Sequence, residues 1–371
     1  MSSEIAETPS VFRRILTAMP DSRTVADVLD KNEIQSVLIL ARGTSDNAAH
    51  FLKYLIETQL GLPCGLTSPS SVTLYKAALH FRGTAVIAIS QSGQSPDLVQ
   101  FATAARNAGA RIISMTNDPQ SPLAELAHLH LTLQAGPELA VAATKTYSAQ
   151  LFTCYLLVAA LANFPTHETQ IIHQAQKLVA NPHLVDEAVN ACDRDEEIVV
   201  LGRGFAYPNA REMALKIQET SKVSVQGLST ADYLHGPISA LTRKTQVFIV
   251  APLHMPIGSI NEAVTKIRPE VDRIFWVGNA GTPQGNDIVI AGGHCKDEVS
   301  TSIVDAISVQ RFALEFATKS GFNPDAPKGL SKVCSHTPSL HSAKVCPACS
   351  VAQPCSTCGG CGPPRPRNSL C

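Results

Sequence analysis

One pattern, a strand followed by a polar turn and a helix, returns several times along this chain. Residues 36–39 form a short β-branched and apolar run, the turn Arg42-Gly43-Thr44-Ser45 follows, and residues 47–60 have a helical pattern. The same order returns with a strand over residues 84–90 and a helix over residues 95–108. Strands that alternate with helices predict a parallel, doubly wound sheet, because each helix carries the chain back to the start of the next strand.

A second round begins near residue 197, where the strand-like run EIVVLG leads into Arg203-Gly204 and another helix. A shift of 161 positions superposes Arg42-Gly43 on Arg203-Gly204 and Leu52 on Met213, each at an equivalent point after a strand. The economical interpretation is duplication of one α/β unit. A length of 371 residues, beyond the usual size of one hydrophobic core, also favours two domains.

We therefore expect two tandem α/β domains, each a doubly wound parallel sheet flanked by helices in a flavodoxin-like three-layer sandwich. The boundary between them is predicted near residue 185. The chain then divides into an N-terminal helical segment at residues 1–25, a first domain at 26–185, a second domain at 186–333 and a cysteine-rich tail at 334–371.

The composition excludes several classes of protein. Hydrophobic residues make up 44% of the chain, charged residues 16%, and the net charge is -1, which argues against a disordered or nucleic-acid-binding chain. The N-terminus MSSEIAETPS lacks the basic and apolar parts of a signal peptide, so we expect a cytoplasmic protein. The most apolar stretch, residues 149–164, is shorter than the roughly 20 residues of a membrane span, so we expect a buried helix and no membrane partner.

The 11 cysteines fall into two groups. Four are scattered through the body of the chain, as expected of small buried hydrophobic side chains: Cys64, Cys154, Cys192 and Cys295. In the tail, the pairs Cys346/Cys349 and Cys355/Cys358 have the spacing of zinc knuckles. Only five residues separate the two pairs. We therefore favour a disordered or non-native extension over a zinc site, and expect no metal.

Two hydroxyl-rich turns are candidate phosphate sites. The first lies where a strand gives way to a helix and contains Ser90, Gln91, Ser92 and Ser95. Ser95 suits the N-cap and Pro96 the first helical position, and the start of a helix attracts anions through its free N–H groups and its dipole. Thr44 and Ser45 follow the preceding strand, at the sheet edge where ligands of such folds bind. The alternative is that these hydroxyls only cap the helices.

Three further side chains are candidates for acid–base chemistry. Lys216 and Glu219 are three residues apart on a predicted helix, so an ammonium and a carboxylate share one face. His235 lies in a loop fixed by Gly236 and Pro237, and histidine suits proton transfer near neutral pH. The alternatives are a surface ion pair, which contributes little, and a solvated loop histidine.

Together these segments resemble the double-SIS-domain sugar-phosphate family. They are similar to the isomerase half of glucosamine-6-phosphate synthase, and more closely to its relatives without a glutaminase domain, the SIS-type glucosamine-6-phosphate deaminases. The resemblance extends from residue 20 to residue 333. Six ordered motifs carry it: Arg42-Gly43-Thr44-Ser45, Ser90-Gln91-Ser92-Gly93, residues 140–145 (AVAATK), residues 214–219 (ALKIQE), His235-Gly236-Pro237 and residues 327–332 (PKGLSK).

The resemblance implies a role for each motif and no metal or organic cofactor. It implies that Glu219 is the base, that His235 opens the sugar ring, and that Lys332 reaches the substrate carbonyl. In the synthase pattern the histidine comes from the neighbouring subunit, so a homodimer with shared active sites is implied. It also implies that Val141 and Ala143 line the sugar. The implied contacts to the phosphate and nearby hydroxyls are Ser45, Ser90, Gln91, Ser92 and Ser95.

The chemistry of an aldose–ketose interconversion fits these residues independently. The reaction moves a proton between C1 and C2, which one carboxylate such as Glu219 can do on either carbon. Lys216 beside it stabilises a developing oxyanion or keeps the carboxylate ionised, and no metal is required. The leading hypothesis is conversion of glucosamine 6-phosphate to fructose 6-phosphate and ammonia.

Three departures from the family pattern bear on this hypothesis. No N-terminal cysteine nucleophile precedes the first domain, which disfavours glutamine-dependent synthesis. Ala143 replaces the serine of the synthase pattern, and the cysteine-rich tail follows Lys332 directly. Two alternatives stay open: a galactosamine-6-phosphate or fructosamine-phosphate deaminase or deglycase and, in another class, a non-catalytic sugar-phosphate sensor. The presence of Glu219 and His235 together with both lysines favours an enzyme.

Overall fold

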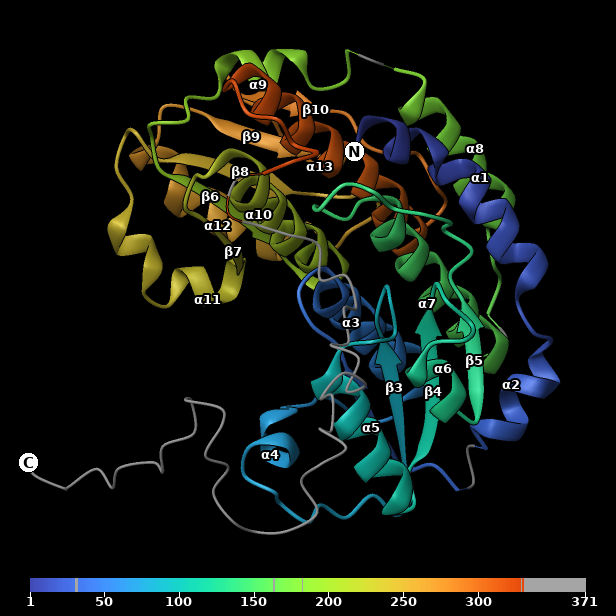
Figure 1. The fold of residues 1–371 in the computed structure, drawn as a ribbon. Coiled ribbons are helices and arrows are strands. Elements are labelled where there is room, and N and C mark those ends of the chain that lie inside the picture. Colours follow the sequence, from blue (N-terminus) through green and yellow to red (C-terminus); the bar gives the residue numbers. More distant parts are fainter. Residues whose placement is uncertain (31–32, 163, 182, 328, 330–371) are drawn as a thin grey trace, which may run out of the picture. The chain divides into compact units, whose positions relative to one another are not determined.

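Two parallel five-stranded sheets, each flanked by helices, form the fold in the computed structural model (Figure 1). The structure describes residues 1–30, 33–162, 164–181, 183–327 and 329. The first sheet has the strand order β2-β1-β3-β4-β5. Its strands are β1 (Ser36–Leu40), β2 (Cys64–Leu66), β3 (Thr84–Ile89), β4 (Arg111–Thr116) and β5 (Leu129–Thr132).

The second sheet repeats the topology of the first. Its order is β10-β9-β8-β6-β7, so its first strand lies between its second and third strands, as β1 does. Gly43 after β1 and Gly204 after β6 both have a φ of 56°, a left-handed conformation that glycine adopts without strain. The predicted duplication and doubly wound α/β fold are thus confirmed. The strands are β6 (Ile198–Gly202), β7 (Val225–Ser229), β8 (Gln246–Val250), β9 (Ile274–Val277) and β10 (Ile288–Ile290).

Helices link the strands and cover the sheets (Figure 1). The α-helices are α1 (Ser2–Ala18), α2 (Ser22–Val28), α3 (Thr44–Leu55), α4 (Ser70–Thr73), α5 (Pro96–Asn107), α6 (Pro122–Leu126), α7 (Lys145–Ala162), α8 (Glu168–Val179), α9 (Asp186–Ala191), α10 (Tyr207–Ser221), α11 (Thr230–Leu234), α12 (Gly258–Ile267) and α13 (Glu298–Lys319). The shorter turns are the π-helix η1 (Ile56–Leu60) and the 3-10 helices η2 (Gly204–Ala206), η3 (Pro237–Ala240) and η4 (Arg268–Glu270). The domain boundary near residue 185 stays a prediction.

The central strands are apolar on both sides because helices cover both faces of a parallel sheet. Every residue of β3, β6, β8 and β9 is buried. The sequence pattern does not indicate β2, β5 and β7. These strands are short or include partly exposed residues, so they lack the continuous apolar run that marks the others.

The two halves meet where α3 packs against α10, the helices that follow β1 and β6 (Figure 1). Their contacts come in pairs related by the shift of 161 positions. Asp46 and Arg211 form an ion pair at 3.1 Å, and its counterpart is the edge-on contact of His50 with Tyr207. His50 and Arg211 occupy equivalent positions and are hydrogen-bonded to each other. An approximate two-fold axis therefore passes through this last pair.

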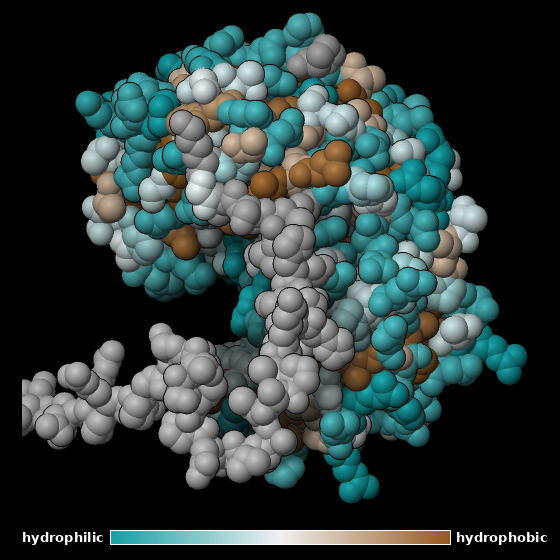
Figure 2. Space-filling model, viewed as in Figure 1, coloured by the Kyte–Doolittle hydropathy of each residue, from teal (hydrophilic) through white to brown (hydrophobic). Residues whose placement is uncertain are grey.

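The helices of the described residues include none that is long and apolar enough to span a membrane. Instead α7, which contains the most apolar stretch of the sequence, is buried from Lys145 to Val158. On the face shown in Figure 2, hydrophilic side chains predominate and hydrophobic ones occur in small groups. The four scattered cysteines are buried and unpaired, as predicted, and burial raises the pKa of the Cys64 thiol to about 12.

Asp305 on α13 is a fully buried carboxyl beside the carboxyl edge of the second sheet. Its Oδ1 accepts the backbone N–H of Gly293 at 2.7 Å, and its Oδ2 has no hydrogen-bond partner among the described residues. The absence of a side chain at Gly292 makes room for the Asp305 carboxyl, since a Cβ there would overlap Oδ1. Burial raises the pKa of Asp305 to about 7, opposed by the bond from Gly293. The neutral acid is therefore the form that fits this site.

This burial predicts that the free energy of unfolding falls as the pH rises from about 4 to about 7. Over that range the folded state retains the Asp305 proton that the unfolded chain releases. Asp305→Asn keeps an acceptor for Gly293 and carries no charge, so we expect it to lose less stability than the wild type over this range. Urea unfolding at about pH 4 and about pH 8 measures the difference, and equal losses in the two proteins would contradict it.

Candidate active site

The first sheet reverses its strand order between β1 and β3. From β1 the chain passes to β2 on one side and then crosses to β3 on the other. Ligands of open α/β sheets bind in the crevice beyond the carboxyl ends of such a pair of strands. The helix α3 begins at Thr44 directly after β1, and α5 begins at Pro96 after β3. The two serine-rich turns identified from the sequence therefore adjoin one crevice.

Three serine hydroxyls of these turns each accept one hydrogen bond and keep their own proton. The pairs are Ser45 Oγ with Gln150 Nε2 at 2.8 Å, Ser90 Oγ with the N–H of Gly93 at 3.1 Å, and Ser92 Oγ with the N–H of Gln94 at 3.3 Å. Because a hydroxyl donates one proton besides accepting, each remains able to donate to an anionic oxygen. Ser95 occupies the N-cap of α5 as predicted, but its side chain makes no capping hydrogen bond.

Gly93 fixes the shape of the turn between β3 and α5. Its φ is 67°, and a Cβ at this position would overlap the hydroxyl of Ser121, the N-cap of α6. Its carbonyl accepts the N–H of Leu123 at 3.2 Å. The turn therefore packs so closely against the start of α6 that only glycine fits there.

The segment predicted to line the sugar lies between β5 and α7. Glu138 is 5% exposed and accepts the backbone N–H groups of Thr144 at 2.8 Å and of Thr146 at 3.2 Å. These bonds fold the segment into a loop that ends at the first turn of α7. Val141 and Ala143 are partly exposed within this loop.

The helix α10 carries a buried charge cluster. Glu212 accepts the amide of Asn47 at 2.8 Å and the hydroxyl of Thr44 at 3.4 Å, which ties α10 to the first turn of α3. The Thr44 hydroxyl thus points to α10. Lys216 Nζ lies 3.6 Å from Glu212 Oε1 and 2.5 Å from Glu219 Oε2. The side chains of Lys216 and Glu212 are fully buried, whereas that of Glu219 is 24% exposed.

The direction of α10 brings this cluster to the crevice. The two helices run antiparallel, because Phe205 before α10 contacts Phe51 late in α3, whereas Glu212 contacts its first turn. At a rise of 1.5 Å per residue, Lys216 and Glu219 lie about 6 Å and about 10 Å further along α10 than Glu212. They therefore extend past the start of α3, on the side of the sheet where the serine turns lie.

The charges of the cluster stabilise one another. Burial alone lowers the pKa of Lys216, but the carboxylates of Glu212 and Glu219 outweigh it and raise the pKa above the usual lysine value. Lys216 is therefore a fixed cation near neutral pH and not an amine nucleophile. Burial raises the pKa of Glu212, opposed by Lys216 and by Asn47. Glu219 is the one member of the cluster whose side chain is partly exposed.

The corresponding place in the second half is filled by the protein itself. Phe205 and Ala206 stand where the first half has Thr44 and Ser45. The carboxyl of Glu298, at the start of α13, lies near the backbone of Gly204, and the N–H of Phe205 opposes the rise in its pKa. A carboxyl of the chain thus lies where an anion would approach the start of a helix. Burial raises the pKa of Glu298 to about 7.

Two candidate residues are not joined to the cluster. His235 is exposed at the end of α11, and among the described residues no hydrogen bond or ion pair links it to Glu219. The described residues do not include Lys332 or the cysteine-rich tail. Of the motif at 327–332 they include only Pro327 and Gly329. Within the described ranges there is no group of three or more His, Cys, Asp or Glu side chains placed to hold a metal.

Sequence reasoning missed Glu212 and Glu138. A signal for Glu212 was available, because it lies four residues before Lys216 and therefore on the same helix face. Glu138 has no such signal. Its partners are backbone N–H groups that come into reach only when the loop closes.

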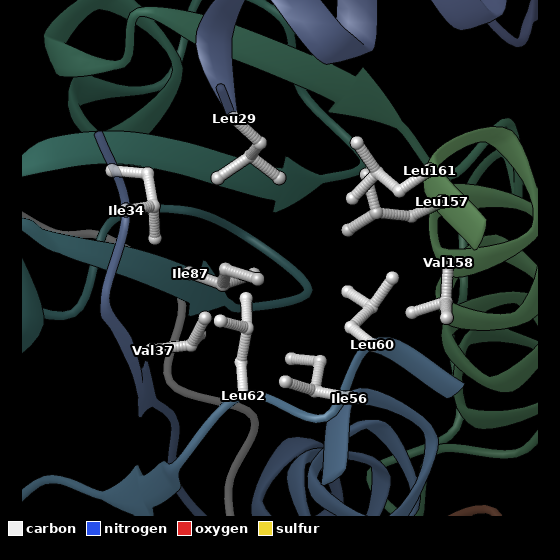
Figure 3. A pocket seen from close by; sticks show the side chains of 10 residues that line it. All are labelled: Leu29, Ile34, Val37, Ile56, Leu60, Leu62, Ile87, Leu157, Val158 and Leu161. Atoms are coloured by element: carbon white, nitrogen blue, oxygen red, sulfur yellow. The ribbon is translucent and has the colours of Figure 1, made fainter. Parts of the chain in front are cut away.

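An apolar cavity of about 20 Å³ is not a candidate for this site (Figure 3). It lies among side chains of β1, β3, η1 and α7, and those drawn in Figure 3 are all aliphatic. They are Leu29, Ile34, Val37, Ile56, Leu60, Leu62, Ile87, Leu157, Val158 and Leu161. No lining side chain offers a polar group to a sugar phosphate, and binding sites need a few such groups to orient a ligand.

The fold and the site define a duplicated, doubly wound α/β protein with serine-rich turns at the strand reversal of its first half. The family model described as SIS domain matches residues 32–160 and 193–254, just over half of the chain. The chain therefore belongs to the SIS domain family.

Relatives and solved structures extend the comparison. Glutamine–fructose-6-phosphate aminotransferase (isomerizing) of Methanothermobacter thermautotrophicus is 29% identical over 338 residues, which are 90% of this chain and 56% of that protein. The chain spans a little over half the length of the curated relatives it matches. A protein of Silicibacter pomeroyi DSS-3, provisionally named a phosphosugar isomerase, superposes with a TM-score of 0.78 at 28% identity, covering 87% of this chain and 99% of that one. Glucosamine-6-phosphate deaminase of Thermotoga maritima shares the fold, with a TM-score of 0.70 at 21% identity over 89% of this chain and 98% of that one.

The buried cluster predicts a large loss of stability when Glu212 is removed. Glu212→Ala leaves the buried Lys216 with one carboxylate and the Asn47 amide without its acceptor, so we expect the free energy of unfolding to fall by about 3 kcal/mol or more. Glu262→Ala is the matched control, because Glu262 pairs with Lys266 four residues on, at 2.9 Å, on the exposed surface of α12. We expect it to leave the free energy of unfolding nearly unchanged, because exposed ion pairs contribute little. Urea unfolding measures both, and similar losses would contradict a special role for Glu212.

Proposed function

We propose that this chain deaminates an amino sugar phosphate, converting glucosamine 6-phosphate and water to fructose 6-phosphate and ammonia. The observation that carries the proposal is the partly exposed Glu219 carboxylate, paired at 2.5 Å with the buried Lys216. Membership of the SIS domain family supports it. So do the names of two similar proteins, which specify fructose 6-phosphate and glucosamine 6-phosphate.

The reaction requires one proton to move between neighbouring carbons. In the open-chain aldehyde, Glu219 takes the C2 proton, the C2–H electron pair forms a C1–C2 double bond, and the C1 oxygen gains negative charge. Return of the proton to C1, with transfer of one proton from the nitrogen to the C1 oxygen, gives the ketose imine. Water then adds at C2, and ammonia leaves to give fructose 6-phosphate.

The other residues supply binding and charge. The hydroxyls of Ser45, Ser90 and Ser92 each retain a proton for the phosphate oxygens. The fixed positive charge of Lys216 orients Glu219 and attracts the negative charge that develops on the C1 oxygen. In this proposal Gln91 and Ser95 complete the phosphate site.

We also infer a homodimer with shared active sites. The support is the exposed position of His235 at the end of α11, without a link to Glu219 of its own chain among the described residues. A histidine that opens the ring must reach the ring oxygen of the substrate. A second copy of the chain supplies it in this proposal, and Lys332 and Ala143 keep the roles that the family resemblance implies.

The direct test is release of ammonia and fructose 6-phosphate from glucosamine 6-phosphate. We expect equal amounts of the two products, and a fall in rate of at least about 100-fold in Glu219→Gln, because the amide cannot take the C2 proton. Glu57→Gln is the control, since Glu57 pairs with Lys53 of α3 at 2.9 Å and its side chain is 37% exposed, against 24% for Glu219. We expect it to keep the wild-type rate.

Other outcomes would redirect or end the proposal. Turnover of galactosamine 6-phosphate or of a fructosamine phosphate instead, still lost in Glu219→Gln, would keep the proton transfer and change the substrate. Tight sugar-phosphate binding without turnover of any of these compounds would replace the enzyme with a sensor.

A further inference from the structure

The first turn of α1 holds the loop that the proposed function assigns to the sugar. Glu4 Oε1 accepts the backbone N–H of Ala140 at 3.1 Å and also that of Leu139. Its second oxygen lies 3.2 Å from the α-amino group of Met1. Glu4 is only 4% exposed, although it belongs to the first turn of the N-terminal helix. A buried carboxylate thus contacts the two residues that precede Val141.

The hydrogen bonds of Glu4 hold the middle of the loop, between two other anchors. Near the start of the loop, Asn117 donates to the carbonyl of Gly136 at 2.8 Å. At its end, Glu138 accepts the N–H of Thr144 at 2.8 Å. Glu4 holds the stretch between these two anchors, where the chain has neither helical nor strand hydrogen bonds. The conformation of this stretch decides where its side chains point.

We propose that Glu4 is a positioning residue for the sugar-binding loop, an inference that rests on the proposed function. Hydrogen bonds from N–H groups to a carboxylate are about twice as strong as those between neutral groups. Two of them on adjacent residues fix both the position and the orientation of the peptide that leads into Val141. Glu4 does not itself reach the sugar. It acts by setting how Val141 and Ala143 face it.

A neighbouring residue provides a matched control. Glu7 lies one turn further along α1 and pairs with the buried Lys145 at 2.7 Å. Its bond is made to the first residue of α7 and not to the backbone of the loop. Glu7→Gln therefore removes a carboxylate from the same face of the same helix and leaves both bonds of Glu4 in place.

The test compares the affinities of two ligands, glucosamine 6-phosphate and inorganic phosphate, measured by calorimetry on the full chain. Inorganic phosphate is small enough to contact the serine turns alone, so we expect its Kd to change by less than about twofold in Glu4→Gln. The Kd of glucosamine 6-phosphate, which also needs the loop, should rise about tenfold in this variant. Glu7→Gln should keep the wild-type ratio of the two affinities. In turnover, Glu4→Gln should raise KM by a larger factor than it lowers kcat.

The outcomes separate this inference from the proposed function. An unchanged ratio in Glu4→Gln, or an equal loss for both ligands, overturns the positioning role and leaves the proposed function standing. If the wild type binds both ligands but releases no ammonia, the deaminase proposal fails and the ratio still decides the role of Glu4. A wild type that binds neither ligand overturns both.

A folding defect leaves the inference testable. If Glu4→Gln shows no cooperative thermal transition, Glu4→Asp takes its place, since it keeps the charge and withdraws it by one methylene. We expect a smaller change in the same ratio, about threefold, for that variant. No change in the ratio for a folded Glu4→Asp would then overturn the inference.

Discussion

A single buried carboxylate, that of Glu212, joins the parts of this molecule on which the proposed chemistry depends. It accepts hydrogen bonds from the first turn of α3 and lies beside the ammonium of Lys216 on α10. Removing the charges of Glu212 and Lys216 from water is unfavourable unless each finds a partner. The lysine can be buried only because carboxylates lie on both sides of it, and Glu219 is held toward the crevice only because the lysine is fixed. The same buried charges therefore determine both how the two halves pack and where the candidate base lies.

Duplication has given two similar halves with different surroundings at equivalent places. The first half presents Thr44 and Ser45 after its first strand, whereas the second presents Phe205 and Ala206. Phe205 packs on Phe51, and Phe51 is the residue that the shift of 161 positions makes equivalent to Glu212. One side of the axis is thus aromatic, and the other side carries the buried charge. A carboxyl from α13 lies near the start of the second helix, whereas the hydroxyls of Thr44 and Ser45 lie at the equivalent place in the first half.

Much of this arrangement could be predicted from local patterns. The apolar runs of the central strands, the glycine turns and the repeat predicted two parallel, doubly wound sheets, and the equivalence of Gly43 and Gly204 follows from the same shift. The short edge strands β2 and β5 could not be predicted, since they owe their conformation to pairing with a neighbour. The contacts of Glu4 and Glu138 could not be predicted from the sequence either. Both carboxylates bond to backbone N–H groups far from regular structure, and backbone groups leave no mark in the sequence.

The axis through His50 and Arg211 has a consequence for how this chain can change. In an association of two identical units, a residue on a symmetry axis faces its own copy, so any substitution appears on both sides at once and a like charge meets itself. Once both units belong to one chain, the two positions are inherited separately. Histidine can then face arginine, with Asp46 on one side and Tyr207 on the other. Fusion therefore removes the requirement of self-complementarity, so equivalent places in the two halves can carry different side chains, as Thr44 and Ser45 differ from Phe205 and Ala206.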